Sequence, residues 1–265
     1  MATQQITRAL GALELLCAHP AGLPLQAVAD ALDMPKSAAH RTLAELAALG
    51  HVRQDPDTAR YLLTTRLLSL AFGFLGQSGL NDVVQPILDR LAEVSGELVR
   101  LGVIDGDRQV WVTKSQGARS GMRYDPDMGR GAALSCTASG HAWLASLPGD
   151  DALALLAREG IASHDGLGSQ APKTLQDVMA LVQKARARGY AWVVDSSAPG
   201  LAALAVAVLH PVTGAVIGTV SVAGPSLRLT EARLPVVSPA LLAAARELGF
   251  ASSGSSFFAA RGSAR

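Results

Sequence analysis

Apolar residues in the first part of the chain recur at the helical period in three separate stretches. These stretches span residues 4–18, 25–32 and 36–49. Periodic apolar positions of this kind predict amphipathic helices that each bury one face. The third helix has well-marked ends, because Pro35 suits the first turn of a helix and Gly50 suits the position just after its last turn.

A short hairpin and a further helix follow the third helix. The segments "HVRQ" and "ARYLL" flank the turn "DPDT", whose Asp and Pro residues favour a reversal of the chain. Three helices and a hairpin are typical of a winged helix-turn-helix, which we expect over residues 1–64. A linker helix is expected over 65–79. It has more apolar residues than one buried stripe requires, so we expect it to pair with the same helix of a second copy.

The remainder of the chain alternates between helical and strand patterns and predicts a second domain over residues 80–250. Helical spacing predicts helices at 80–95, after Thr137, at 175–188 and at 229–249, with an Asp- and Gly-containing loop before residue 175. The predicted strands are "ELVRLGVID", "RQVWVTKS", "YAWVVD", "LAALAVAVLH" and "AVIGTVSVAG". This order indicates an α+β domain with a mixed or antiparallel sheet and helices on its faces. The low-complexity tail, 251–265, is expected to be flexible.

Composition and charge limit how the chain could work. Aromatic residues make up only 4% of its 265 residues, so its cores must be built from Ala, Leu and Val. The net charge of +1 disfavours general electrostatic coating of nucleic acid, and any DNA contact must come from individually placed charges. The sequence starts without a signal-peptide pattern, its longest apolar run is about half a membrane span, and its two cysteines are far apart. We therefore expect a cytoplasmic protein with no membrane partner.

Signatures of catalysis and of metal or nucleotide binding are sparse. No GxGxxG or GxxxxGK[ST] motif stands between a strand and a helix, and there is no HExxH motif or CxxC pair, so no metal or cofactor is expected. Cys136, Ser139 and His141 could suggest a nucleophile and a base, but no acidic residue neighbours them and GxSxG is missing. The simpler interpretation is a helix start capped by Thr137. An enzyme on the α+β domain remains the weaker alternative.

Particular strings of the sequence resemble the IclR family of bacterial transcription regulators over about residues 3–250. The strings that carry the resemblance are "TRALGALELL", "GLPLQAVADALDMPKSAAHRTLAELAALGHVRQDPDTARYLLT", "LSCTASGHAWLASLP", "RARGYAWVVD" and "GTVSVAGP". The resemblance implies a winged helix-turn-helix joined to an effector-binding domain with a GAF-like α/β fold. It also implies a homodimer or a dimer of dimers that binds a palindromic double-stranded DNA operator. A ligand-sensing module that acts through protein partners is the other alternative.

The third helix is the predicted recognition helix. Small side chains in its N-terminal part would permit close approach to the major groove, where Arg41 could bind guanine and Lys36 a phosphate or a base. Arg53 and Arg60 flank the hairpin turn, where a wing can contact the DNA backbone or minor groove. The full predicted DNA-binding set is Lys36, Ser37, Ala38, His40, Arg41, Thr42, Arg53 and Arg60.

The effector site is predicted at the start of the helix after Thr137. The first N–H groups of a helix lack intrahelical partners and lie at the positive end of its dipole, so they can bind a carboxylate. The resemblance adds Ser221, and it places Val193 and Ala203 where some relatives have polar groups. We therefore expect an aromatic or otherwise hydrophobic acid. The full predicted effector-binding set is Ala138, Ser139, Ser221, Val193, Ala203, Leu134 and Arg123.

Overall fold

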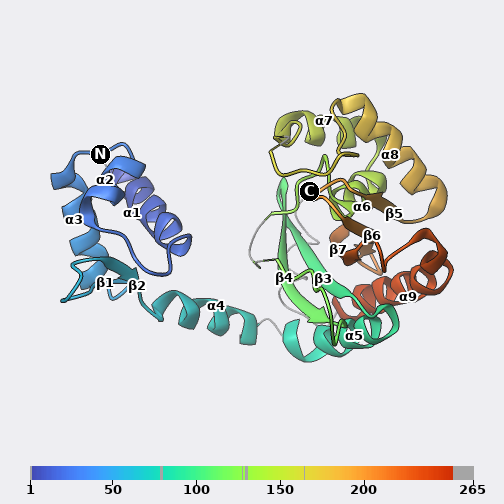
Figure 1. The fold of residues 1–265 in the computed structure, drawn as a ribbon, viewed down its shortest axis with the longest axis horizontal. Helices are drawn as coiled ribbons and strands as arrows, with labels where there is room; N and C mark the ends of the chain where they lie inside the picture. The colour runs from blue at the N-terminus through green and yellow to red at the C-terminus, as the bar shows by residue number, and fades with distance from the viewer. Residues whose placement is uncertain (1, 78–79, 127, 129–130, 164, 253–265) are drawn as a thin grey trace. The chain divides into compact units, whose positions relative to one another are not determined.

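The computed structural model describes residues 2–77, 80–126, 128, 131–163 and 165–252. The chain divides into two compact units, Met1–Gln77 and Ser78–Arg265. Most of the predicted flexible tail lies outside the described residues, which end at residue 252. Figure 1 gives the order of the elements along the chain.

The N-terminal unit has the predicted winged helix-turn-helix pattern. Its elements in chain order are α1 (Ala2–Cys17), α2 (Leu25–Ala31), α3 (Lys36–Ala48), β1 (Val52–Gln54), β2 (Tyr61–Leu63) and α4 (Arg66–Gln77). Strands β1 and β2 pair in an antiparallel hairpin in which Arg53 lies opposite Leu62. The prediction of three helices followed by a hairpin is therefore confirmed.

One core joins the helices and the wing of this unit. Leu16, Val28, Leu43, Val52 and Tyr61 are buried together. The turn between α1 and α2 closes tightly on the wing, since a Cβ at Gly22 would lie 2.7 Å from the carbonyl oxygen of Tyr61. Because the core contacts only one side of α3, the opposite side of that helix faces outward.

Several apolar side chains of this unit lie outside its core. On α1, Ile6 and Leu10 are exposed, although their helical spacing would allow them to lie on a buried face. On α4, Leu68, Leu70 and Phe72 are exposed. These residues form apolar surface that the unit alone does not cover.

The C-terminal unit is a five-stranded antiparallel sheet between two layers of helices. Its elements in chain order are α5 (Leu80–Ser95), β3 (Leu98–Asp105), β4 (Arg108–Gln116), α6 (Ala138–Ser146), α7 (Gly149–Glu159), α8 (Leu175–Arg188), β5 (Ala191–Val194), β6 (Leu201–Leu209), β7 (Val216–Pro225), a 3-10 turn (Glu231–Arg233) and α9 (Leu234–Ser252). The strand order is β4-β3-β7-β6-β5. All neighbouring strands are antiparallel. The sequence predicted a mixed or an antiparallel sheet, and the second type is the one observed.

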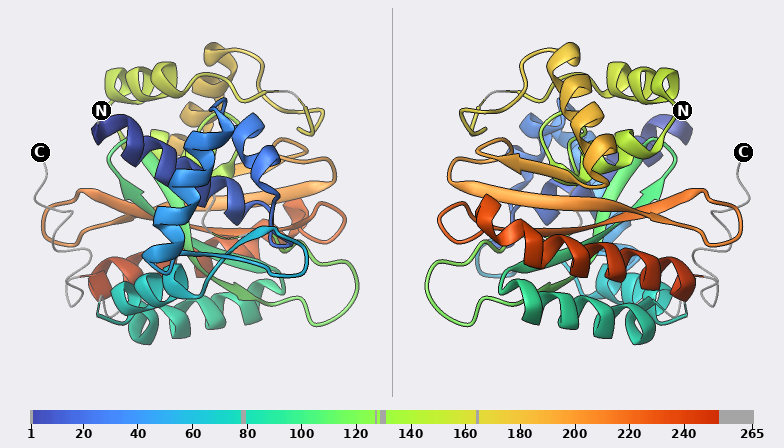
Figure 2. Two further views of the ribbon diagram at one scale, coloured as in Figure 1. Left: turned by 90° about the vertical axis from the view of Figure 1, so that its left-hand side faces the viewer. Right: turned by 90° about the vertical axis from the view of Figure 1, so that its right-hand side faces the viewer.

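The two faces of the sheet carry side chains of different size. Helices α5 and α9 cover one face, where the core contains large side chains such as Leu88, Leu101, Leu204 and Leu241. Helices α6, α7 and α8 lie on the other side of the sheet, as the right-hand view of Figure 2 shows. Directly beneath α6 the sheet presents alanines, which include Ala203, Ala205 and Ala223. Small side chains there allow α6 to lie close to the strands.

Helix α7 was not predicted. We expected only a loop between α6 and residue 175, and that expectation is wrong for residues 149–159. The local sequence does favour a helix, because Ala152, Leu155 and Leu156 recur at the helical period and are buried, and acidic residues occupy the first turn. The Asp and Gly residues at the start of the segment were mistaken for a loop.

Helix α9 and the turn before it, Glu231–Ser252, are long and apolar enough to cross a membrane by length and composition, and among the described residues no other helix is. The inner face of α9 packs on the sheet, where Val237, Leu241 and Leu248 belong to the main core. Packing on the sheet accounts for the buried part of α9, which is 33% of its most apolar stretch, whereas Val236 and Phe250 are exposed.

Candidate functional site

The outward side of α3 carries the polar groups that were predicted to meet DNA. Lys36, Ser37, His40 and Arg41 are exposed. The helix starts directly after Pro35, whose backbone angles are φ −56° and ψ 141°. This start places Lys36 and Ser37 in the first turn, the part of a recognition helix that contacts base edges.

Two residues of the predicted DNA-binding set differ from the expectation. Ala38 and Thr42 are only 7% and 6% exposed. They are one helical turn apart, at the margin between the buried and exposed faces of α3, and Ala38 packs with Ala29 and Met34 of the preceding helix and turn. Both residues support α3 from within the unit, so the exposed part of the set is smaller than the sequence suggested.

A hollow of about 350 Å³ lies between α1 and α3. Arg8 and Arg41 line it from the two helices, and Gln5 Nε2 donates a 2.6 Å hydrogen bond to the Glu45 carboxylate across it. Arg8 was not among the residues predicted to bind DNA. Its helical position alone could not show that it shares a hollow with Arg41, because that depends on how α1 packs against α3.

The two cations of the wing are exposed, and each already has a partner. Arg53 lies 3.7 Å from the carboxylate of Asp55. Hydrogen bonds from the N–H and hydroxyl of Thr58 lower the pKa of Asp55, so the turn keeps a negative charge beside Arg53. Arg60 Nη1 donates to the carbonyl of Gly22 at 2.9 Å, which leaves its remaining N–H groups for other acceptors.

The C-terminal unit contains a cavity of about 280 Å³ at the start of α6. Four residues of the predicted effector-binding set line this cavity: Ala138, Ser139, Ala203 and Ser221. They come from α6, β6 and β7, which are far apart in sequence. The sheet and α6 therefore bring together a large part of the predicted set.

The start of α6 is built as the sequence predicted. Thr137 is the N-cap, and its Oγ1 accepts a 2.9 Å hydrogen bond from the N–H of Gly140 while donating to the carbonyl of Ala133 at 2.7 Å. The N–H groups of Ala138 and Ser139 come earlier in the helix, where intrahelical acceptors are lacking. Since both residues line the cavity, this helix end can offer N–H donors to a bound molecule.

Three other residues of the predicted set do not line the cavity. Leu134 is fully buried in a cluster with α7 and α8. Val193 packs in the alanine-rich layer next to Ala203, and Arg123 is exposed. Leu134 and Val193 thus support the cavity from outside its wall.

Arg100 of β3 also lies in the wall of the cavity, although it was not among the predicted residues. Its side chain is 5% exposed, and Nε and Nη1 have no hydrogen-bond partner among the described residues. The guanidinium carbon lies 3.6 Å from the ring centre of Trp111 and 5.7 Å from that of Tyr124. Burial lowers the pKa of Arg100, whereas the electrostatic interaction and the side-chain hydrogen bond with Tyr124 raise it. A charged residue inside the otherwise uncharged run 98–104 of β3 was the signal that could have identified it.

Cys136 and His141 are not arranged as a nucleophile and its base. Burial raises the pKa of the Cys136 thiol, which disfavours the reactive thiolate. Burial lowers the pKa of His141, and its Nε2 lies 2.9 Å from the carbonyl of Ser135. A carbonyl can only accept, so Nε2 carries the proton and His141 is neutral and bound to the backbone. Among the described residues no group of three or more His, Cys, Asp or Glu side chains could hold a metal ion.

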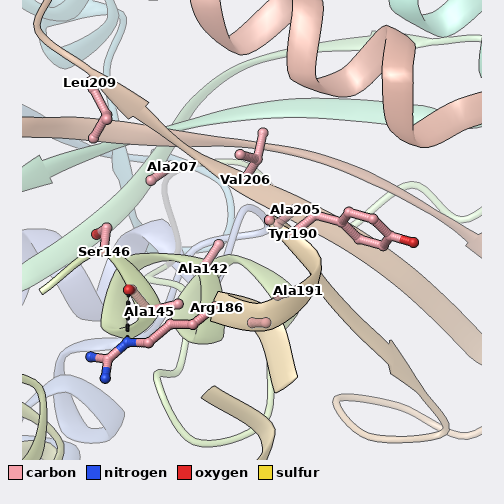
Figure 3. Close-up of a pocket in the computed structure, with 12 residues that line it drawn as sticks. Ala142, Ala145, Ser146, Arg186, Tyr190, Ala191, Ala205, Val206, Ala207 and Leu209 are labelled. Carbon is pink, nitrogen blue, oxygen red and sulfur yellow. Dashed lines mark hydrogen bonds between the residues drawn. The ribbon is translucent and has the colours of Figure 1, made fainter. Parts of the chain in front are cut away.

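A second hollow, of about 260 Å³, lies on the far side of α6 (Figure 3). Apolar residues such as Ala142, Ala145 and Val206 form much of its wall. Among the described residues of its lining Arg186 is the only cation, and it donates to the carbonyls of Ala145 and Leu147 at 3.0 and 2.6 Å. This arginine satisfies the C-terminal carbonyls of α6, so its role in the hollow is structural.

The chain is similar to known transcription regulators along almost its whole length. Residues 5–56 match the IclR helix-turn-helix domain, and residues 72–249 match the family described as bacterial transcriptional regulator IclR C-terminal. The HTH-type transcriptional regulator BhcR of Paracoccus denitrificans is 34% identical over 248 residues, which cover 92% of this chain and 86% of BhcR. The transcriptional repressor IclR of Escherichia coli is 27% identical over 252 residues, which cover 95% of this chain and 90% of that repressor.

Solved structures show the same fold. The IclR transcriptional regulator of Alicyclobacillus acidocaldarius matches with a TM-score of 0.80 at 22% identity, over 93% of this chain and 98% of that one. An IclR homologue of Microbacterium hydrocarbonoxydans, solved in complex with 4-hydroxybenzoate, matches with a TM-score of 0.76 at 19% identity and the same coverage. At these identities the comparison concerns the fold alone.

Proposed function

The chain belongs to the IclR family of DNA-binding transcription regulators, and we propose that a small organic acid in its C-terminal cavity controls it. A regulator of this family is not an enzyme, in agreement with the raised pKa of the Cys136 thiol and with the bond between the His141 ring and the Ser135 carbonyl. The observation that carries the proposal is the cavity itself, which joins N–H donors of α6 to Ser221 and to an apolar wall. Acting on chromosomal DNA, the protein works in the cytoplasm.

Recognition of DNA is assigned to the exposed face of α3 and to the wing. Arg41 and Lys36 are the long cations of this face, and Ser37 and His40 complete it. Because Arg8 shares the hollow beside Arg41, we add it to this surface as a phosphate contact. Arg53 and Arg60 contribute less, since an acid and a carbonyl already engage them.

The effector is proposed to be an aromatic or otherwise hydrophobic acid. Trp111, Tyr124 and Leu201 provide flat or apolar surface in the cavity wall, and Ala203 leaves space beside them. Pockets of this size and composition hold small ligands through apolar contact and a few placed polar groups. The Microbacterium hydrocarbonoxydans homologue, which was solved with 4-hydroxybenzoate, supports this class of acid.

Assembly as a homodimer or a dimer of dimers is proposed from the uncovered apolar side chains of the N-terminal unit. Leu68 and Phe72 on α4, with Ile6 and Leu10 on α1, are more apolar surface than a monomeric unit needs. Two copies joined there would present two α3 helices to a palindromic operator. We expect a fragment ending at Gln77 to self-associate in sedimentation experiments, and Phe72→Asp to weaken this association. A monomeric fragment beside a dimeric full-length protein would move the interface to the C-terminal unit.

A gel-shift experiment tests the proposal as a whole. The probe is DNA from the intergenic region upstream of the protein's own gene, with and without 4-hydroxybenzoate. We expect a specific complex whose midpoint shifts with the acid, and no specific complex for Arg41→Ala at the same concentration. Binding of the acid without any specific DNA complex would instead favour a sensor that acts through protein partners.

A further inference from the structure

The cavity contains a buried positive charge, Arg100, and no acidic side chain among the described lining residues neutralises it. Arg100 is 5% exposed, and its Nε and Nη1 have no hydrogen-bond partner among the described residues. None of the described residues that line the cavity is an Asp or a Glu. The indole Nε1 of Trp111, on which the guanidinium stacks, is likewise buried without a partner.

The position of Arg100 is fixed by the sheet rather than by a polar network. Arg100 of β3 lies directly opposite Ser221 of β7, and Trp111 of β4 lies opposite Gly102, the next residue of β3 on the same face. Both side chains therefore project toward α6 and not toward the core beneath α5 and α9. Gly102 leaves room on this face of the sheet, which the Gln109 side chain fills on its way to Thr219.

Buried arginines are ordinarily paired, because a charge removed from water without a partner is costly. Stacking on Trp111 and a hydrogen bond with the Tyr124 side chain offset part of this cost, but Nε and Nη1 still have no partner among the described residues. An anion bound in the cavity would satisfy them. Apart from Ser221, the wall next to Arg100 is aromatic and apolar, so a carboxylate attached to a small hydrophobic body fits better than a strongly hydrated inorganic ion.

We propose that Arg100 binds the carboxylate of the effector and so determines the specificity of the site for acids. In this arrangement the N–H groups of Ala138 and Ser139, on the α6 side of the same cavity, bind a second oxygen function of the effector, such as a hydroxyl or oxo group. This inference rests on the proposed acid effector and refines it: the effector is an acid that carries a second polar group. It also reassigns the carboxylate from the helix end, where the sequence placed it, to the sheet.

The experiment compares an acid with its uncharged isostere on the full-length protein. The probes are 4-hydroxybenzoate and 4-hydroxybenzamide, measured by calorimetry on wild type, Arg100→Met, Arg100→Lys and Arg188→Met. Arg188→Met is the matched control, because it removes an exposed arginine on α8 that does not line the cavity. We expect wild type and Arg188→Met to prefer the acid by at least about tenfold. We expect the preference to disappear in Arg100→Met and to return in part in Arg100→Lys.

A merely structural role for Arg100 would change the affinity for both probes together and leave their ratio intact. The inference is overturned if Arg100→Met, folded by circular dichroism, still prefers the acid as strongly as wild type does. It is also overturned if wild type binds the acid and the amide equally well.

A second series separates failure of this inference from failure of the proposed aromatic effector. Formate, acetate and benzoate are added at equal ionic strength to chloride, and the melting temperature is followed. If 4-hydroxybenzoate does not bind but a simple carboxylate stabilises wild type and not Arg100→Met, Arg100 is the acid-binding residue and the aromatic effector is wrong. If 4-hydroxybenzoate does not bind, equal shifts in the two proteins for every carboxylate, including no shift in either, overturn the role of Arg100.

Discussion

Helix α3 and the wall of the C-terminal cavity each carry an arginine, but one arginine is exposed to water and the other is buried. Arg41 lies on the exposed face of α3, where water solvates its charge, and the core on the other side of the helix does not include it. Arg100 lies inside the C-terminal unit with two N–H-bearing nitrogens unpartnered among the described residues. A charge in water costs the folded state little, whereas a buried and unpaired one is destabilising until a ligand neutralises it.

This difference extends to the whole of each site. The exposed residues of α3 can change without altering the packing of the N-terminal unit. In the C-terminal unit Ala138, Ala203 and Ala223 line the cavity and also form the layer between α6 and the sheet. Contacts with DNA should therefore be separable from stability, whereas the effector site and the stability of its unit are coupled.

The largest effect on stability should come from adding one methyl group to Gly140 of α6. A Cβ at Gly140 would lie 2.5 Å from the Cα of Leu134 and 2.7 Å from the carbonyl oxygen of Ala133, and backbone cannot move aside cheaply. We expect Gly140→Ala to destabilise the C-terminal unit by about 3 kcal/mol. Trp fluorescence during urea unfolding reports this unit, because Trp111, Trp143 and Trp192 all belong to it.

Gly149→Ala is the matched control for this substitution. A Cβ at Gly149, the first residue of α7, would meet nothing within 4 Å, so we expect the unfolding midpoint to be unchanged. Similar losses of stability in both variants would show that the close approach of α6 to the segment before it does not limit the stability of the unit.

A contrasting effect is expected at the surface of α3. Arg41→Ala should weaken operator binding by about 1–3 kcal/mol and relax the base preference at one position of each half-site. Its unfolding curve and its affinity for the acid should match those of wild type, because Arg41 lies outside both cores. Titration of the operator and of base-substituted operators measures the effect, with Arg188→Ala as the control. A loss of stability equal to the loss of DNA affinity would contradict the separation of site and core in this unit.

Acid should weaken the C-terminal unit through His141. Burial holds the pKa of folded His141 below its ordinary value, whereas in the unfolded chain the ring takes up a proton near pH 6.5. The unfolded state therefore binds more protons as the pH falls, and stability decreases by up to about 1.4 kcal/mol per pH unit below roughly pH 6.5. Trp fluorescence unfolding between pH 7 and pH 5 measures this slope.

His141→Gln isolates the contribution of the ring. An amide N–H can still donate to the carbonyl of Ser135, the partner of the native ring, but it does not titrate. We expect the pH slope of this variant to be smaller than that of wild type by the stated amount. Identical slopes would show that other groups cause the acid sensitivity of the unit.

The smallest effect should come from one N–H group at the start of α6. Ala138→Pro removes a donor that faces the cavity, and the extended Thr137 before it, with ψ 148°, accommodates a proline at the first helical position. We expect acid binding to weaken by about 1 kcal/mol, with little change in melting temperature. Ala138→Ser keeps the N–H and should bind as wild type does. Calorimetry that finds equal affinities for all three proteins would remove the helix end from the effector site.

The sequence was sufficient wherever the relevant geometry was local. The helices of the N-terminal unit follow from apolar periodicity, and the cap of α6 follows from Thr137 and the small residues after it. The exposed face of α3 was predicted except at its margin, where Ala38 and Thr42 are small enough to pack inside. Local spacing cannot tell a marginal position from an exposed one, because the answer depends on how closely α2 approaches.

The cavity could be predicted only in part, because its wall is assembled across the sheet. Arg100 meets Ser221 through strand pairing between residues 121 positions apart, and no local pattern specifies that pair. The resemblance identified Ser221 but not its neighbour. Arg123 was in the predicted set and Arg100 was not, yet the fold leaves Arg123 exposed.

The strand order also determines the order in which the two units can fold during synthesis. The N-terminal unit ends at Gln77, so all of its contacts exist soon after that residue leaves the ribosome. Strand β3 pairs with β7, which ends at Pro225, so the sheet around Arg100 stays open until nearly the whole chain has been made. Such long-range pairing is also the slower step of folding. In a nascent chain α3 therefore folds well before the sheet that forms the proposed effector site, and control by an effector would begin only after β7 has been made.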